Sequence, residues 1–148
     1  MDPCDFLKIA DGLKNSCEEA GRRSAVSRAY YAAFHYIRLY LVREGIDVPQ
    51  GGTIHDKIPK YLRYSGLQKA KDVAKCMQEL RDDRKEADYK IALEDLKSRE
   101  DRKVLERFNT KTCELLVNKA QQIIQDFNSC KGQELIQGIE NYKTVTKT

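Results

Sequence analysis

The segment from residue 80 to 89, LRDDRKEADY, places charged groups where a helix would be expected to be apolar. Arg81, Arg84 and Asp88 continue the stripe that the preceding apolar residues occupy at helical spacing, so their side chains should point towards the core. Arg84 and Asp88 are four residues apart and can form an ion pair, with Tyr89 at its border. Two inward arginines can hold a phosphate, and an ion-pair network that fixes the helix register explains the same pattern. The sequence leaves both interpretations open.

A second segment, residues 25–42, is apolar or aromatic around most of a helical wheel, which is typical of a central helix. Its polar side chains form one narrow stripe: Ser24, Ser27, Arg28, Tyr31, His35 and Arg38. Because unpaired buried charge is costly, this stripe must meet solvent, a satisfied polar network or a ligand. We take Arg28 and Tyr31, together with Arg81 and Arg84, as the candidate ligand-binding residues.

Standard catalytic and metal-binding motifs are missing from the sequence. His35 and His55 are the only histidines, and no glycine-rich phosphate loop, HExxH, CxxC or nucleophile elbow occurs. Carboxylates at ligand spacing to the histidines are also lacking, so we predict neither a metal site nor a cofactor.

Composition and charge set the broad class. The 148 residues suit one domain, and a charged fraction of 34% with only three prolines favours a helical protein. The five cysteines are odd in number and widely spaced, which predicts free thiols in a reducing, cytoplasmic compartment. The start lacks the pattern of a signal peptide, and the longest apolar stretch is too short to cross a membrane. A net charge of +4 permits a polyanionic partner without requiring one.

Helical periodicity predicts an all-α fold. Asp2 and Pro3 form a helix start, and Gly45 supplies a left-handed helix stop. The expected long helices run from residue 3 to about 21, from 22–24 to 44, from 67 to about 89 and from about 98 to 130. Residues 46–53 are expected to be a loop, residues 55–64 a short helix or a turn, and a break is expected between 90 and 98. The expected buried face of the last helix consists of Leu105, Phe108, Thr112, Leu115, Ala120, Ile123 and Phe127. We predict an antiparallel four- to five-helix up-and-down bundle over 1–130, followed by a polar tail at 131–148 that is a frayed helix or a flexible arm.

Three strings of the sequence resemble one family. SRAYYAAFHYIRLYL (residues 27–41) is similar to the second helix of HEPN proteins (higher eukaryotes and prokaryotes nucleotide-binding). LRDDRKEADY (80–89) resembles the later helix of the branch that carries an arginine and then Ala-Asp-Tyr, and TIH (53–55) resembles the start of its middle helix. The resemblance covers about residues 5 to 130.

This resemblance implies a helical bundle that commonly forms a homodimer with the arginine helices around a shared cleft. It also implies a metal-independent ribonuclease with a histidine four to six residues after the arginine, often paired with a nucleotidyltransferase in toxin–antitoxin or phage-defence systems. Arg84 matches the arginine, but no histidine follows it, and Asp88 and Tyr89 occupy that region. The near-neutral pKa of histidine is what allows proton exchange with RNA hydroxyls, so standard nuclease catalysis is not expected.

Three functions remain as hypotheses, and whether the protein is an enzyme stays open. The first is a HEPN module that binds RNA, a nucleotide or a nucleotidyltransferase partner through the candidate ligand-binding residues. The second is a divergent metal-independent endoribonuclease that uses Arg84, Asp88 and Tyr89, with His35 as a substitute histidine. The third is a structural dimerisation domain in which the charges only specify packing.

Overall fold

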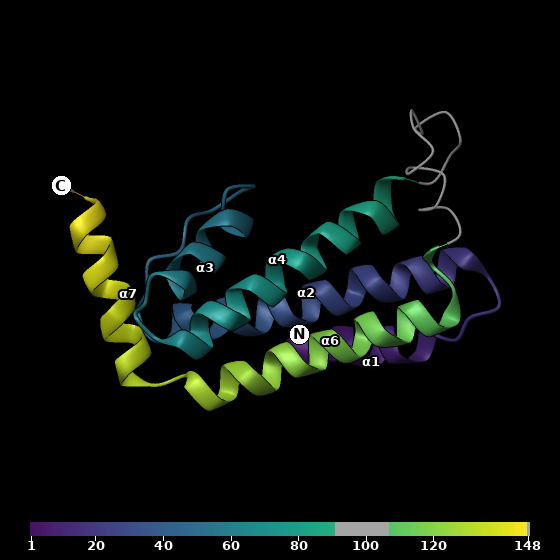
Figure 1. Cartoon of the computed structure of the whole chain (residues 1–148), viewed down its shortest axis with the longest axis horizontal. Helices are drawn as coiled ribbons and strands as arrows, with labels where there is room; N and C mark the ends of the chain where they lie inside the picture. The colour runs from purple at the N-terminus through teal and green to yellow at the C-terminus, as the bar shows by residue number, and fades with distance from the viewer. Residues whose placement is uncertain (91–106, 148) are drawn as a thin grey trace. The chain divides into compact units, whose positions relative to one another are not determined.

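The regular elements are all helices in the part of the chain that the computed structural model describes, residues 1–90 and 107–147. They are α1 (Pro3–Leu13), α2 (Glu19–Arg43), α3 (Ile54–Arg63), α4 (Gln68–Tyr89), α6 (Thr110–Cys130) and α7 (Gln133–Thr146), shown in Figure 1. The predicted all-α class and helical bundle are therefore confirmed. Within these residues, no helix combines the length and the apolar character that a membrane crossing needs.

The start of α1 follows the sequence, but its end does not. Asp2 caps the helix by accepting a hydrogen bond from the backbone N–H of Cys4 at 2.8 Å. The predicted continuation to about residue 21 is wrong, because α1 ends at Leu13 and α2 begins at Glu19. The turn between them is held by Arg22, whose Nη1 donates to the carbonyl oxygens of Ser16 (2.8 Å) and Cys17 (3.0 Å).

The middle helices match their predicted limits closely. Gly45 has φ +82° and ends α2, and the predicted loop at 46–53 separates it from α3. Gly66, at φ +88°, lies in the turn between α3 and α4. Both glycines adopt the left-handed conformation that other residues rarely accept.

The last predicted helix is shorter than expected. Residues 108 and 109 are not helical, and α6 begins at Thr110 because the Asn109 side chain accepts from the N–H of Thr112 at 2.9 Å. The predicted break between 90 and 98, the helix start at 98 and Leu105 lie outside the described residues. Leu115 is 60% exposed, so its predicted burial is wrong; Leu116 and Val117 lie on the buried face instead.

The chain divides into two compact units that share the long helices α2, α4 and α6. Unit 1 consists of residues 1–32 and 79–121, and unit 2 of residues 33–78 and 122–148. The largest fully buried side chains of unit 1 include Val26, Leu80 and Phe108, and those of unit 2 are Ile37, Leu41, Ile58, Leu62, Ile123, Phe127, Leu135 and Ile139. Each unit thus has its own apolar core.

The segment after residue 130 forms helix α7, where the sequence suggested a frayed helix or a flexible arm. Leu135 and Ile139 are fully buried, and α7 packs against α3 in unit 2 (Figure 1). The backbone of Gly138 approaches the turn after α3 so closely that an added Cβ would meet the carbonyl oxygen of Ser65 at 1.8 Å. Leu135 and Ile139, four residues apart, are too few apolar residues to predict a packed helix from the sequence, but their burial covers one face of the short helix α7. The domain boundary at residue 130 stays a prediction.

We predict that Gly138→Ala destabilises the protein by about 1–3 kcal/mol, because the new methyl group would collide with backbone that cannot rotate away. Urea denaturation measures the change, and limited proteolysis should show earlier cleavage within α7. Gly12→Ala is the matched control, because nothing lies within 4 Å of the new Cβ. As a helical Gly-to-Ala change it should be neutral or stabilise by up to about 1 kcal/mol. Equal stability of the two variants would contradict the close approach of α7.

Candidate functional site

Arg84 lies in unit 1 among aromatic rings. Its side chain is 9% exposed, and its Nη1 lies 3.3 Å from Asp88 Oδ2, as the spacing in α4 predicts. The guanidinium carbon lies 5.3 Å from the ring centroid of Tyr30, 5.5 Å from that of Tyr31 and 6.0 Å from that of Tyr89. The cation is therefore stabilised both by a carboxylate and by the faces of three rings. We call Tyr30, Tyr31, Arg84, Asp88 and Tyr89 the Arg84 cluster.

Asp88 joins α4 to the polar stripe of α2. Its Oδ2 accepts a hydrogen bond from Ser27 Oγ at 3.2 Å, and its side chain is partly exposed. Ser27 and Tyr31 are one turn apart on α2, and both reach residues of α4. The two anomalous stripes of the sequence thus meet in one place.

Two other predicted ligand-binding residues are Arg28, on α2, and Arg81, on α4. Arg28 is exposed, with its guanidinium carbon 5.6 Å from the ring centroid of Phe6 in α1. Arg81 is partly buried one turn before Arg84. Tyr89, at 67% exposed, is the most open member of the Arg84 cluster.

The predicted substitute histidine belongs to unit 2. The ring of His35 packs edge-on against Phe34 at 5.2 Å between centroids, and the ring of His55 stacks on the same Phe34 at 4.3 Å. Burial and the nearby charge of Arg38 lower the pKa of His35 below its ordinary value, which favours the neutral imidazole. A catalytic role for His35 stays a prediction.

Arg23 is a structural residue that sequence reasoning missed. Its buried side chain donates from Nη1 to three backbone carbonyl oxygens at the end of α4, those of Glu86 (3.2 Å), Ala87 (3.1 Å) and Lys90 (3.0 Å). Its Nε donates to Glu19 at 2.6 Å, and its guanidinium carbon lies 4.7 Å from the ring centroid of Phe108. Arg23 therefore caps the helix end that carries Asp88 and Tyr89. Nothing in its sequence spacing distinguished it from a surface arginine.

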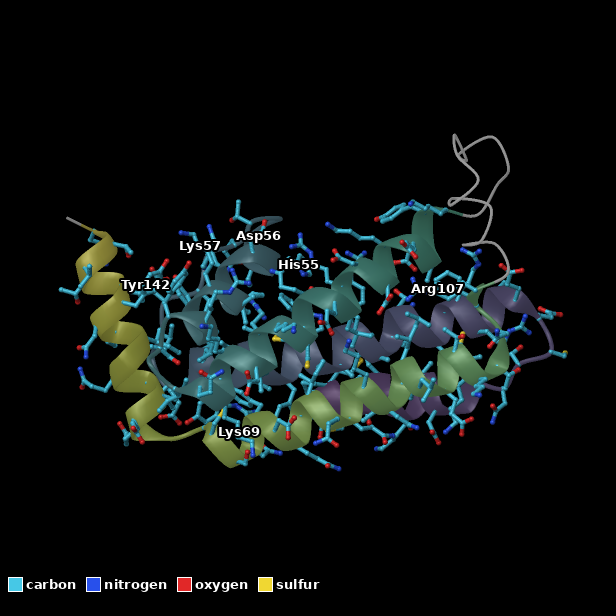
Figure 2. The ribbon with its side chains drawn as sticks, viewed as in Figure 1. His55, Asp56, Lys57, Lys69, Arg107 and Tyr142 are labelled. Carbon is cyan, nitrogen blue, oxygen red and sulfur yellow. The ribbon has the colours of Figure 1, made fainter. Side chains whose placement is uncertain are left out.

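Arg107 holds the same helix through side chains. It pairs with Asp83 and, at 2.5 Å, with Glu86, both on α4. Arg107 belongs to unit 1 and is labelled in Figure 2. Two acidic residues of α4 are thus held in ion pairs with Arg107, while Asp88 pairs with Arg84.

A pocket of about 420 Å³ borders the Arg84 cluster. Glu19, Ala20, Arg23, Ser24, Ala87 and Asp88 line it. Two carboxylates and one guanidinium give it no excess of positive charge, so by itself it is not an anion site. Across residues 1–90 and 107–147, no group of three or more His, Cys, Asp or Glu side chains is arranged to hold a metal ion.

Comparison with known families agrees with the fold and with the sequence strings. The family model of the HEPN domain matches residues 7–130, and the chain belongs to this family. The predicted resemblance is thereby confirmed. Neither a curated protein nor a solved structure matches the chain.

We predict that His35 makes stability depend on pH. Because the pKa of His35 is lower in the folded chain than its ordinary value of 6.5, the unfolded chain takes up the proton first as the pH falls. The free energy of unfolding should therefore decrease as the pH drops below about 6.5, and His35→Gln should weaken that decrease. Urea denaturation at several pH values tests this, and an unchanged pH profile in the variant would contradict it.

We also predict that Arg23→Gln lowers the free energy of unfolding by about 2 kcal/mol, because a charged donor to the α4 carbonyls is lost. Relative to the wild type, the rate of amide hydrogen exchange in Arg23→Gln should increase most at the end of α4, from Ala87 to Lys90. Arg43→Gln, at the exposed end of α2, is the control and should change stability by less than about 0.5 kcal/mol. A loss of stability without faster exchange in α4 would show that Arg23 does not act as a cap.

Proposed function

We propose that this HEPN protein binds a phosphate-bearing ligand, a nucleotide or RNA, beside the Arg84 cluster and lacks the usual ribonuclease chemistry of the family. The observation that carries this proposal is the guanidinium of Arg84 surrounded by three tyrosine rings on the helix that bears the family arginine. Exposed Tyr89 offers a face on which a base can stack, and exposed Arg28 offers positive charge for a phosphate.

The chemistry of the cluster supports binding better than cleavage. An arginine stabilises phosphate charge without moving protons, and an ionised carboxylate such as Asp88 can only accept one. A tyrosine hydroxyl is a poor acid or base near neutral pH. No histidine follows Arg84 in the sequence, so α4 itself supplies no imidazole for proton transfer.

The charge balance of the cluster limits how a ligand can approach. Arg84 is already paired with Asp88, so a phosphate gains little from that pair alone. We infer that Arg84 and Asp88 hold Tyr31 and Tyr89 in place, and that Arg28 supplies the charge that attracts the ligand. Arg81 lies one turn before Arg84 on the same side of α4 and adds a second positive charge there.

One alternative has a specific observation in its favour. Because Arg84 is buried and ion-paired, the cluster also fits a structural dimerisation domain in which it only fixes helix register. A homodimer, a nucleotidyltransferase partner, a place in a toxin–antitoxin or phage-defence pair and a cytoplasmic location remain further proposals. The same experiment separates the structural domain from the binding module.

The test is fluorescence anisotropy with a fluorescent ATP analogue and with a labelled single-stranded RNA, at about 50 mM salt where phosphate contacts are strong. Arg28→Gln should weaken binding of at least one probe by about tenfold, the value of a charged hydrogen bond. Arg84→Gln should weaken it by about the same factor, because Tyr31 and Tyr89 lose the cation that holds their rings for stacking. Lys85→Gln, an exposed lysine next to Arg84, is the matched control and should bind like the wild type.

Each other outcome points to a different function. If the wild type binds neither probe, and Arg84→Gln lowers only the melting temperature or the dimer content, the structural domain replaces the proposal. If RNA is cleaved in the presence of a metal chelator and Arg84→Gln abolishes cleavage, the protein is a divergent ribonuclease. Arg28→Gln keeps the test decisive if Arg84→Gln fails to fold, because Arg28 is exposed.

A further inference from the structure

The excess positive charge of the protein lies entirely in unit 2. Residues 33–78 and 122–148 contain eleven Lys and Arg against seven Asp and Glu, whereas unit 1 contains sixteen of each. Unit 2 therefore carries the whole formal charge of +4. A local excess of this kind attracts a polyanion to one part of a protein whose total charge is small.

Within unit 2, helix α3 presents a basic face to solvent. Its buried residues are Ile54, Ile58, Pro59, Tyr61 and Leu62. Its exposed residues are Asp56, Lys57, Lys60 and Arg63, followed at the helix end by Tyr64. Lys57, Lys60 and Tyr64 recur at three and four residues and so share one side of the helix. Figure 2 labels Lys57 and Asp56 on α3 and Tyr142 on α7.

An aromatic stack continues this face onto α7. The rings of Tyr64 and Tyr142 are stacked, with centroids 4.9 Å apart and planes at 21°. Tyr142 also meets buried Tyr61 edge-on at 6.4 Å, which anchors the pair to the core side of α3. Tyr64 is nevertheless 53% exposed. Since the stack with Tyr142 covers part of the ring, more than half of Tyr64 still lies open to solvent outside that contact.

We propose that Lys57, Lys60, Arg63, Tyr64 and Tyr142 form a binding surface for single-stranded nucleic acid, which we call the α3–α7 surface. The cations contact successive phosphates, and an unpaired base stacks on the open side of Tyr64, which extends the Tyr64–Tyr142 stack by one ring. Because Tyr142 already holds the Tyr64 ring in place, less side-chain entropy is lost when a base binds to Tyr64.

The surface fits this partner better than the alternatives. An anionic membrane would require a broad apolar face beside the cations, whereas the exposed residues within α3 are all charged and Tyr64 at its end is an amphipathic ring already stacked on Tyr142. A duplex offers phosphates but keeps its bases stacked inside, so Tyr64 would contribute little to binding it. The proposal concerns unit 2 alone and does not depend on the Arg84 cluster of unit 1.

The experiment measures anisotropy of fluorescein-labelled oligo(A), as RNA and as DNA, about 12 nucleotides long, which is within the range one such site covers. Titrations with the full chain run from about 50 to 200 mM salt. In Lys57→Gln/Lys60→Gln, affinity at low salt should fall by at least tenfold, and the slope of log K against log salt should shrink by about 1.4, or about 0.7 for each lost phosphate contact. Tyr64→Leu should weaken binding by about tenfold, whereas Tyr64→Phe, which keeps the ring, should restore it.

Matched controls and competitors separate this surface from general charge effects. Lys8→Gln/Lys111→Gln removes the same charge from exposed positions of unit 1 and should bind like the wild type. A duplex of the same sequence should compete more weakly than the single strand. Stronger binding of the RNA than of the DNA would assign the 2′-hydroxyl a role, and equal binding would assign recognition to phosphate and base stacking alone.

The proposal is overturned if Lys57→Gln/Lys60→Gln and Tyr64→Leu bind oligo(A) like the wild type, or if the wild type binds only anionic vesicles. Oligo(A) binding that is lost in Arg28→Gln but kept in the α3 variants would support the Arg84 cluster and reject the α3–α7 surface. The reverse pattern would support the surface and count against the cluster, so the two proposals fail separately.

Discussion

A buried guanidinium is stabilised by hydrogen-bond acceptors and aromatic faces, and in unit 1 this requirement links α2 to the end of α4 and to the segment before α6. Arg23 meets it with the last carbonyl oxygens of α4, and Arg22 with the carbonyl oxygen of Phe108 at 2.8 Å and those of the turn before α2. Arg84 meets it with Asp88 and the surrounding tyrosine rings. Because unpaired buried charge costs several kcal/mol, these arginines specify the packing as strongly as the apolar residues do.

The same requirement applies to Arg84, which is buried in α4. Arg84 has an acidic neighbour four residues later, Asp88, with which it forms an ion pair. The Arg84 cluster therefore contains an ion pair beside three tyrosine rings, and among its neighbours Arg28 is exposed, as is Tyr89 of the cluster. Unit 2 differs in kind, because it holds the excess charge and an exposed stacked tyrosine.

Helix limits were predictable where local chemistry fixes them and unpredictable where a distant side chain does. The cap at Asp2 and the left-handed Gly45 depend only on neighbouring residues, and both were read correctly. The end of α1 depends on the guanidinium of Arg22 holding the turn carbonyls, which no periodicity records. The sequence left the tail as a frayed helix or a flexible arm, because the packing of α7 involves Gly138 approaching Ser65, a contact between segments about seventy residues apart.

The sequence by itself determined the all-α class, the family, the spacing of Arg84 and Asp88 and the lack of a following histidine, because each follows from residue types at helical intervals. Only the tertiary structure decided which helices bring those residues together. Ser27 bonding to Asp88, Arg23 capping α4 and Tyr142 stacking on Tyr64 all join segments far apart along the chain. Such contacts are set by how whole helix faces pack, and periodicity along one helix does not contain that information.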